Sequence, residues 1–158
     1  MSRARALRVV LASVVSVVAS CVVGTGAVIA AYVDLDSSFG TGGKVTTPIG
    51  STTWGTGNDQ GRAVAIDSQG RVIVAGLANI GNSDDFATVR YTPDGLLDMT
   101  FGTVGKVTTD FDNGSGDYAH AVAVDSHDRV VVAGYSWNAG TYDFAVVRYT
   151  PSGLLDMS

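Results

Sequence analysis

Glutamate is absent from this chain of 158 residues and lysine occurs only twice, whereas aspartate accounts for all 15 acidic side chains and glycine occurs 20 times. Glutamate and lysine are the usual surface residues of helices, so their scarcity argues against a mainly helical protein. Aspartate and glycine favour turns, and the plentiful valine, threonine and tyrosine favour strands. The composition therefore predicts an all-β protein with many tight turns.

Cysteine is nearly absent too: Cys21 is the only one, and it lies in an apolar stretch near the N-terminus. Arg3, Arg5 and Arg8 precede that stretch, which runs from about residue 9 to residue 31 without a charge. A basic start, an apolar middle and small residues at the end are typical of a secretory signal, here a signal helix over residues 1–31. The alternative is a retained membrane anchor, because the run is long enough to span a bilayer.

Removal of this segment would leave 7 basic and 15 acidic side chains, a net charge of 7 − 15 = −8, and no cysteine. No intrachain disulfide could then form. We expect no nucleic-acid partner, because phosphate binding needs a basic face. We expect a secreted or cell-surface protein that touches a membrane only through the N-terminal segment, if that segment is not cleaved.

The chain contains an internal repeat. "DFATVRYTPDGLLDM" (Asp85–Met99) returns as "DFAVVRYTPSGLLDM" (Asp143–Met157), identical at 13 of 15 positions. "RAVAIDSQGRVIVAGL" (Arg62–Leu77) is answered by "HAVAVDSHDRVVVAGY", and "LDSSFGTGGKVTT" (Leu35–Thr47) by "LDMTFGTVGKVTT". The chain beyond the N-terminal segment therefore divides into a first repeat, residues 35–96, and a second repeat, residues 97–158.

Each repeat contains four stretches that favour strands, separated by turn sequences such as "DSQG" and "TPDG". The expected strands are Lys44–Thr47, Arg62–Asp67, Arg71–Leu77 and Phe86–Tyr91, with the counterparts Lys106–Thr109, His120–Asp125, Arg129–Tyr135 and Phe144–Tyr149. The third is apolar on both faces, which indicates a sheet covered on both sides. Stacked four-stranded sheets are typical of β-propellers, so we expect two four-stranded antiparallel, blade-like repeats of an incomplete β-propeller.

The motifs "LDSSFGTGGKVTT", "AVAIDSQGRVIVAG" and "DFATVRYTPDGLLD" resemble the delta-60 repeat, a bacterial repeat of exported proteins. The resemblance covers Leu35–Ser158 and implies a propeller-type fold, usually with more than two copies and with no assigned reaction. Trp54 and its loop have no counterpart in the second copy. The sequence ends where a third copy would begin, and a closed propeller needs at least four sheets. A fragment of a longer protein, assembly with further repeats in trans, and a stand-alone two-sheet stack are the open alternatives.

The repeats show no recognisable set of catalytic residues. His120 and His127 occur only in the second copy, where the first has Arg62 and Gln69, so a site present in each sheet cannot depend on them. No nucleophile elbow, zinc-protease motif or phosphate loop is present. We therefore expect no catalytic residues and no cofactor, and we predict that the protein is not an enzyme.

Two weak binding candidates remain. Asp110, Asp112 and Asp117 lie on a glycine-rich loop that suits Ca²⁺, although a solvated turn is the favoured interpretation of them. Trp54 and Trp137 could form a surface for glycan or protein, or could fold back over a sheet edge.

Four recurring residues suit structural roles. Asp85 and Asp143 are expected to bond backbone amides at a turn, and Arg90 and Arg148 to pack on a tyrosine or pair with an aspartate. The leading hypothesis is an exported, non-enzymatic repeat protein with a structural or binding role; the alternative is a carbohydrate- or calcium-dependent adhesion module.

Overall fold

The computed structural model describes residues 34–50, 58–81, 83–111 and 116–158. The compact unit Asp34–Ser158 contains all of them. The predicted signal helix, Cys21, Trp54 and Asp112 lie outside the described residues. Among those residues, no helix has the length and apolar character needed to cross a membrane.

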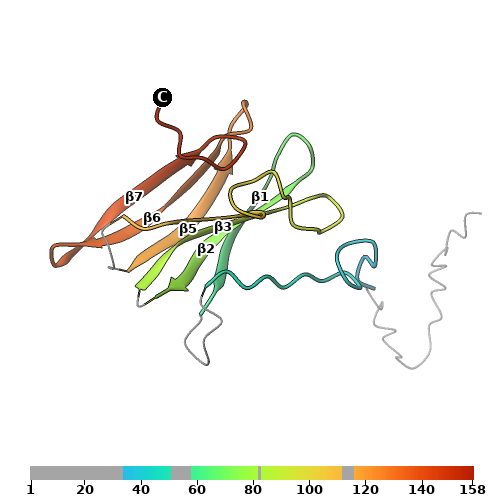
Figure 1. Cartoon of the computed structure of the whole chain (residues 1–158), viewed down its shortest axis with the longest axis horizontal. Coiled ribbons are helices and arrows are strands. Elements are labelled where there is room, and N and C mark those ends of the chain that lie inside the picture. The colour runs from blue at the N-terminus through green and yellow to red at the C-terminus, as the bar shows by residue number, and fades with distance from the viewer. Residues whose placement is uncertain (1–33, 51–57, 82, 112–115) are drawn as a thin grey trace, which may run out of the picture. The chain divides into compact units, whose positions relative to one another are not determined.

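In the described part of the chain seven strands form two antiparallel sheets, and the expectation of an all-β fold is confirmed (Figure 1). Sheet 1 has the order β1-β2-β3-β4 and sheet 2 the order β5-β6-β7. The strands are β1 (Gln60–Ile66), β2 (Val72–Ile80), β3 (Ser83–Tyr91), β4 (Lys106–Thr109), β5 (Asp117–Val124), β6 (Val130–Asn138) and β7 (Thr141–Tyr149).

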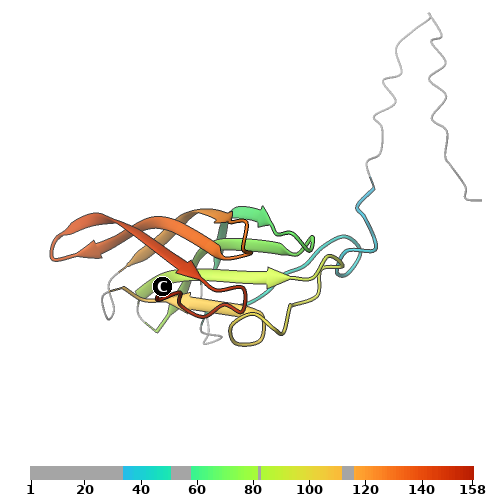
Figure 2. The same ribbon diagram turned by 90° about the horizontal axis from the view of Figure 1, so that it is seen from above.

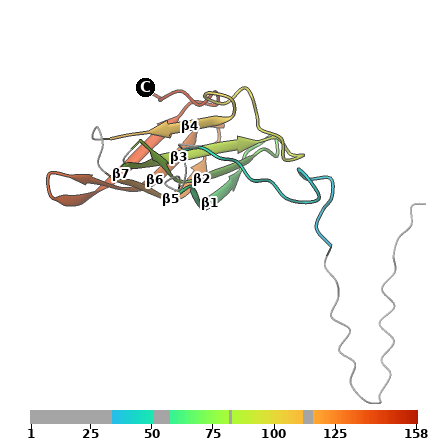
Figure 3. The same cartoon turned by 60° about the horizontal axis from the view of Figure 1, so that its bottom comes forward.

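The fourth strand of sheet 1 comes from the second repeat, which the sequence did not predict. β4 pairs with β3 so that Phe86 faces Thr109 and Val89 faces Lys106, and Figure 3 shows the two strands side by side. The predicted strand Lys44–Thr47 is wrong, since its only pairing among the described residues is an isolated bridge between Lys44 and Gly40. The edge of β3 that such a strand would use is occupied by β4.

The prediction of two four-stranded sheets is therefore wrong for sheet 2, which has three strands among the described residues. β4 fills the place beside β3, and no described segment fills the corresponding place beside β7. The Arg148 carbonyl at the end of that edge accepts the Asp156 amide. Along Phe144–Val147 the outward backbone groups are available to another strand, because an edge strand leaves every second residue unpaired.

The turns that join the strands follow the predicted chemistry. In "TPDG" and "TPSG", Gly95 and Gly153 adopt φ values of 81° and 82°, and their amides bond to Thr92 and Thr150. In the tight turn before β6, Asp128 takes the left-handed conformation, with φ 57°, that Gly70 has in the first repeat. Asparagine and aspartate tolerate this region better than other residues with a side chain.

A glycine opposite a β-bulge recurs in both sheets. The ladder shifts register between Gly61 and Ala63, and again between Ala119 and Ala121. Opposite these bulges, a Cβ on Gly76 would lie 1.8 Å from the Gln60 carbonyl oxygen, and one on Gly134 would lie 2.0 Å from that of Tyr118. Only glycine permits this approach, which explains the shared "VAG" sequence.

The core lies between the two sheets, which Figure 2 shows one beside the other. Sheet 1 contributes Ile73, Ala75 and Phe86, and the loop before β4 contributes Phe101. From sheet 2 come Ala119, Val130, Val132, Ala145, Val147 and Tyr149, with Val122 and Val124 packed against them. Cross-strand pairing aligns Val122, Val132 and Val147 in one row and Val124, Val130 and Tyr149 in the next. One face of sheet 2 is therefore covered by sheet 1.

Candidate binding surfaces and a carboxylate cluster

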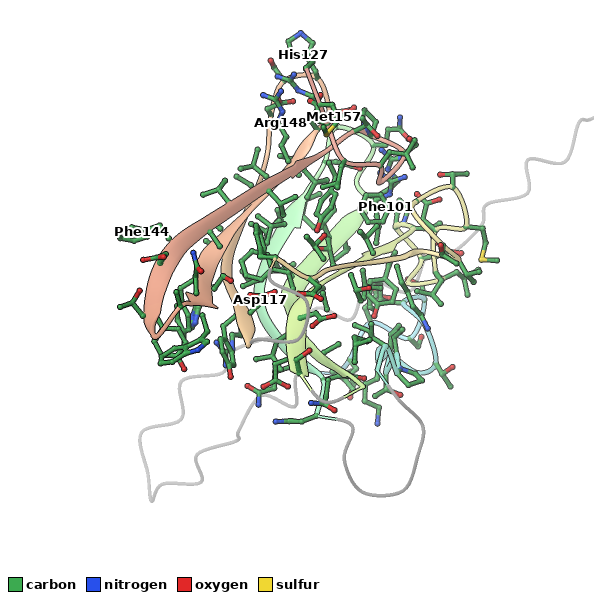
Figure 4. All side chains as sticks on the ribbon, turned by 60° about the vertical axis from the view of Figure 1, so that its left-hand side comes forward. Phe101, Asp117, His127, Phe144, Arg148 and Met157 are labelled. Carbon is green, nitrogen blue, oxygen red and sulfur yellow. The ribbon has the colours of Figure 1, made fainter. Side chains whose placement is uncertain are left out.

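The opposite face of sheet 2 is uncovered. We call it the outer face of sheet 2 and define it by cross-strand partners that share one side: Ala121, Ala123, Val131, Ala133, Tyr135, Phe144, Val146 and Arg148. Phe144 is 101% exposed and Val146 is 61% exposed. Figure 4 shows the Phe144 ring pointing away from β7.

The equivalent residues of sheet 1 are buried because sheet 2 covers them. Phe86 and Thr88 are 0% exposed, where Phe144 and Val146 are the second-repeat counterparts. Ile73 and Ala75 are buried in the same way. The outer face of sheet 2 is thus the surface that buries a neighbouring sheet in the first repeat.

Sheet 1 is only partly covered on its side away from sheet 2. The N-terminal face of sheet 1 carries Val64, Ile66, Val72 and Val74, which form two cross-strand pairs. Val64 is 64% and Ile66 59% exposed, although their counterparts Val122 and Val124 pack in the core. The outer face of sheet 2 corresponds to the face of sheet 1 that is buried in the core, and the N-terminal face of sheet 1 corresponds to the face of sheet 2 that is buried there. The chain therefore makes this sheet-to-sheet contact once internally and exposes one further copy of each side.

The segment before β1, residues 40–47, contacts sheet 1 in the same way as residues 102–109, which include β4, contact sheet 2. The Gly40 amide donates to the Asp94 carbonyl at 2.8 Å, and the Gly102 amide donates to the Ser152 carbonyl at 2.8 Å. The Tyr91 hydroxyl donates to Thr47 Oγ1 at 2.8 Å.

The counterpart of this last bond joins Thr109 Oγ1 and the Tyr149 hydroxyl at 2.6 Å. Two contacts thus have equivalents in both repeats. The "KVTT" segment Lys44–Thr47 is therefore held in the position of a fourth strand, without a sheet beside it.

Arg90 and Arg148 each pair with an aspartate, as one of the two expected arrangements requires. Arg90 Nε lies 2.8 Å from Asp98 Oδ2, and Arg148 Nε lies 2.7 Å from Asp156 Oδ2. The Arg90 side chain is 1% exposed and sits 4.5 Å from the centre of the Phe101 ring, whereas the Arg148 side chain is 34% exposed. Both pairs close the turn after the last strand of a repeat, which is a structural task.

Aromatic rings gather on sheet 2 and not on sheet 1. Trp137 lies 4.8 Å from Tyr142, Tyr142 lies 4.9 Å from Tyr135, and Tyr135 lies 5.1 Å from Tyr118, all between ring centres. Trp137 is 40% and Tyr142 58% exposed. The first repeat has Gln60, Leu77, Asn79 and Asp84 at the four corresponding positions. The fold itself therefore does not require these rings.

The two histidines lie apart. The His120 ring stacks on Tyr135, with 5.1 Å between ring centres, and His120 Nε2 lies 2.7 Å from Arg62 Nη1. His127 is exposed at the turn before β6, with Nδ1 3.3 Å from the Ser126 hydroxyl. No described contact joins the two histidines into a single site.

Three carboxylates meet where β3, the end of β4 and the start of β5 come together. Asp85, Asp110 and Asp117 each offer one oxygen, and these oxygens lie within 4.8 Å of one another. Asp110 and Asp117 were candidates from the sequence, while Asp85 was expected to bond backbone amides. Its described hydrogen bond instead comes from the Ser83 hydroxyl, at 3.1 Å.

Asp85 was missed as a member because it lies 25 positions before Asp110, in another strand. Only the pairing of β4 with β3 brings the two together. No spacing rule within one loop could have identified it.

The environment of the cluster is unfavourable for negative charge. Asp85 is 5% exposed and Asp117 0% exposed. Burial raises the pKa of Asp85, and the nearby Asp110 and Asp117 carboxylates raise it further against the opposing effect of the Ser83 hydroxyl. One oxygen of Asp117, Oδ2, accepts the Phe111 amide at 2.8 Å. Its other oxygen, Oδ1, has no hydrogen-bond partner among the described residues.

A family model matches two segments of the chain, residues 68–101 and 128–158, one in each repeat. Its description is "Domain of unknown function (DUF5122) beta-propeller". The chain is similar to a β-propeller repeat family. Similarity to this β-propeller family supports the propeller-type interpretation of the two sheets, which agree with partial blades. No curated protein matches the sequence.

Proposed function

We propose that this chain is an exported, non-enzymatic β-propeller-type repeat protein whose role is structural: it extends a stack of sheets by binding a second copy of itself. One observation carries the proposal. The face that sheet 2 presents outward is the face that sheet 1 buries, and Phe144 is fully exposed where Phe86 is fully buried.

The fourth strand for sheet 2 is available in a second copy. Lys44–Thr47 has the same sequence as β4, Lys106–Thr109, and β7 has nearly the same sequence as β3. By analogy with the β3–β4 register, Thr47 of the incoming copy would face Phe144, and Lys44 would face Val147. Main-chain hydrogen bonds would provide affinity, as in other cases of strand addition.

The incoming copy needs no internal rearrangement to make this contact. Its Lys44–Thr47 segment already rests on its own sheet 1 through the Tyr91–Thr47 and Gly40–Asp94 hydrogen bonds. Once the segment pairs with β7 of the first copy, the outer face of sheet 2 meets the N-terminal face of sheet 1. Such a head-to-tail interface is heterologous and builds rings or open filaments.

The test is a complementation of two interface variants. Phe144→Asp places a charge on the outer face of sheet 2, and Val64→Asp places one on the N-terminal face of sheet 1, where Val64 is 64% exposed. Both residues are exposed, so each variant is expected to fold. Each variant alone should be monomeric by analytical ultracentrifugation, while an equimolar mixture should form one heterodimer through the remaining intact interface.

Met99→Asp is the matched control, since Met99 is 65% exposed and lies outside both faces. It should associate as the wild type does. A wild-type protein that stays monomeric at high micromolar concentration would contradict the proposal. Association of Val64→Asp with itself would contradict it as well, because that result indicates a contact that does not use the N-terminal face of sheet 1.

Export rests on the N-terminal sequence alone. Arg3, Arg5 and Arg8 followed by an apolar run support a cleaved signal over residues 1–31. Sequencing the N-terminus of the protein recovered outside the cell tests this. A start between residues 30 and 35 agrees with cleavage, and a full-length chain in the membrane fraction indicates the anchor.

A second candidate function, glycan binding, is favoured by the aromatic cluster of Tyr118, Tyr135, Trp137 and Tyr142. Exposed indole and phenol rings offer flat apolar surfaces with polar edges. A glycan panel with wild-type protein and Trp137→Ala would test it. Binding that Trp137→Ala abolishes would support this function, and an empty panel would reject it.

A further inference from the structure

We infer that Asp85, Asp110 and Asp117 form a calcium site at the junction between sheet 1 and sheet 2. This inference is independent of the self-association proposed above, since the three carboxylates belong to one chain and none is among the residues that define the two docking faces.

The spacing of the three carboxylate oxygens suits a single ion. Calcium binds oxygen ligands at about 2.3–2.6 Å, so two oxygens on one ion are at most roughly 5 Å apart. The three oxygens meet this condition, since all lie within 4.8 Å of one another. The donor set is entirely oxygen, which suits hard cations and not zinc or copper.

A second observation points to a ligand. Asp117 is 0% exposed, and its Oδ1 has no hydrogen-bond partner among the described residues, while Oδ2 is already held by the Phe111 amide. The Ser136 hydroxyl, on the strand position directly opposite Asp117, is also buried without a described partner. A buried carboxylate oxygen without a partner is costly, and a cation removes that cost.

The architecture explains what the ion would do. Asp85 is on β3 of sheet 1, Asp117 begins β5 of sheet 2, and Asp110 directly follows β4; Figure 4 labels Asp117 between the two sheets. An ion bound to all three carboxylates would join the two sheets at this corner and cancel their mutual repulsion. Calcium is favoured over magnesium because a site made from three separate segments does not impose the strict octahedral geometry that magnesium requires.

The repeats provide a natural control within the chain. The counterparts of Asp85 and Asp117 are Asp143 and Asp59, and the counterpart of Asp110 is Pro48. Asp59 accepts the Ile49 amide at 2.8 Å, just as Asp117 accepts that of Phe111. Asp143 is exposed on β7 and is not one of the three clustered carboxylates, although it shares the cross-strand partner Ser136 with Asp117. Variants at Asp143 therefore alter a carboxylate of the same repeat position without removing a proposed ligand.

Isothermal titration with CaCl₂, and separately with MgCl₂, tests the site on the purified chain. We expect one calcium per chain with a dissociation constant on the order of 0.1–1 mM, as in extracellular calcium modules. At 10 mM Ca²⁺ the melting temperature should rise by about 3–8 °C relative to EGTA. Asp110→Asn, at an exposed position, should weaken binding at least tenfold, and Asp143→Asn should bind as the wild type does.

Asp85→Asn provides a second variant that should also lose binding. It should fold, because removing a buried charge from among like charges relieves repulsion. Equal calcium responses in wild type, Asp110→Asn and Asp85→Asn would overturn the inference. So would a melting temperature of the wild type that Ca²⁺ leaves unchanged, or magnesium binding that is tighter than calcium binding.

Discussion

Phe86 and Phe144 occupy the same position in the two repeats, yet the first ring is fully buried and the second fully exposed. Both precede the same Ala-x-Val-Arg-Tyr sequence, and both pair with the second strand of a hairpin. The difference is the presence of sheet 2 on one of them. A ring that packs in the core in the first repeat lies on the surface in the second, and an exposed apolar surface of this kind is typical of an interaction site.

Replacing phenylalanine with alanine should therefore lower the free energy of unfolding by very different amounts at Phe86 and at Phe144. Phe86→Ala should reduce the free energy of unfolding by about 3–5 kcal/mol, because it removes a buried ring that also packs edge-on against Phe111 at 5.0 Å. Phe144→Ala should change it by less than about 0.5 kcal/mol in the monomer. Urea unfolding at low protein concentration measures both, and similar costs would mean that Phe144 is covered in solution.

The glycines opposite the bulges give a second pair of predictions. Gly76→Ala and Gly134→Ala should each cost more than about 2 kcal/mol, because a Cβ would lie on a carbonyl oxygen of the neighbouring strand. Gly42→Ala is the control: nothing lies within 4 Å of its Cβ position, and only its φ of +60° opposes the change, at about 1–2 kcal/mol. Thermal melts rank the three, and a Gly76→Ala protein as stable as Gly42→Ala would refute the close approach.

The paired arginines differ in burial and should differ in importance. Arg90→Met leaves Asp98 without its buried partner, and we expect a loss of about 3–5 kcal/mol in the free energy of unfolding. Arg148→Met, whose side chain is 34% exposed, should cost less than about 1 kcal/mol. Chemical denaturation compares the two. If Arg148→Met is as costly as Arg90→Met, then the turn after β7 is buried in an assembly.

Much of the fold was accessible from the sequence because the repeat encodes it locally. The expected strand Arg71–Leu77 starts one residue before β2 and otherwise lies within it, Phe86–Tyr91 lies inside β3, and Lys106–Thr109 is β4 with the predicted bounds. Alternation of apolar residues, "DSQG" and "TPDG" supplied that information. The partner of the "KVTT" strand was not accessible. A repetitive sequence reads the same whether a sheet closes with its own first strand or with the next one, so the phase of the repeat is a tertiary property.

The carboxylate cluster illustrates the same limit. Asp110 and Asp117 stand out in the sequence because they flank a glycine-rich loop. Asp85 looked like a repeated turn residue, since Asp143 matches it. Its neighbours in space come from the loop after β4 and from β5, which are specific to the junction of the two sheets. Residues with one role in the repeat can thus acquire another where two repeats meet.

The last prediction concerns pH, and its sign differs between two groups of aspartates. Hydrogen bonds from Ser158 and the Arg148 guanidinium lower the pKa of Asp156 to about 2. Asp125 also has a pKa of about 2, because the amide of His127 and the side chain and amide of Arg129 outweigh the effect of burial. A carboxylate with a lowered pKa in the folded state stabilises the fold above its ordinary value of 3.8, and this contribution is lost as the pH falls through about 2.

Asp85 acts in the opposite direction, because burial and its acidic neighbours raise its pKa. The folded state then holds the Asp85 proton more tightly than the unfolded state does, so stability declines as the pH rises from 3.8 to the raised value and stays lower above it. Without calcium, Asp85→Asn should therefore be more stable than the wild type at pH 7 and should lose that advantage below pH 3.8. Urea midpoints measured from pH 2 to pH 7 in EGTA test this, and an Asp85→Asn protein that is less stable than the wild type at pH 7 would contradict it. Adding Ca²⁺ at pH 7 should stabilise the wild type alone, since an ion bound by three carboxylates offsets the repulsion that the substitution removes.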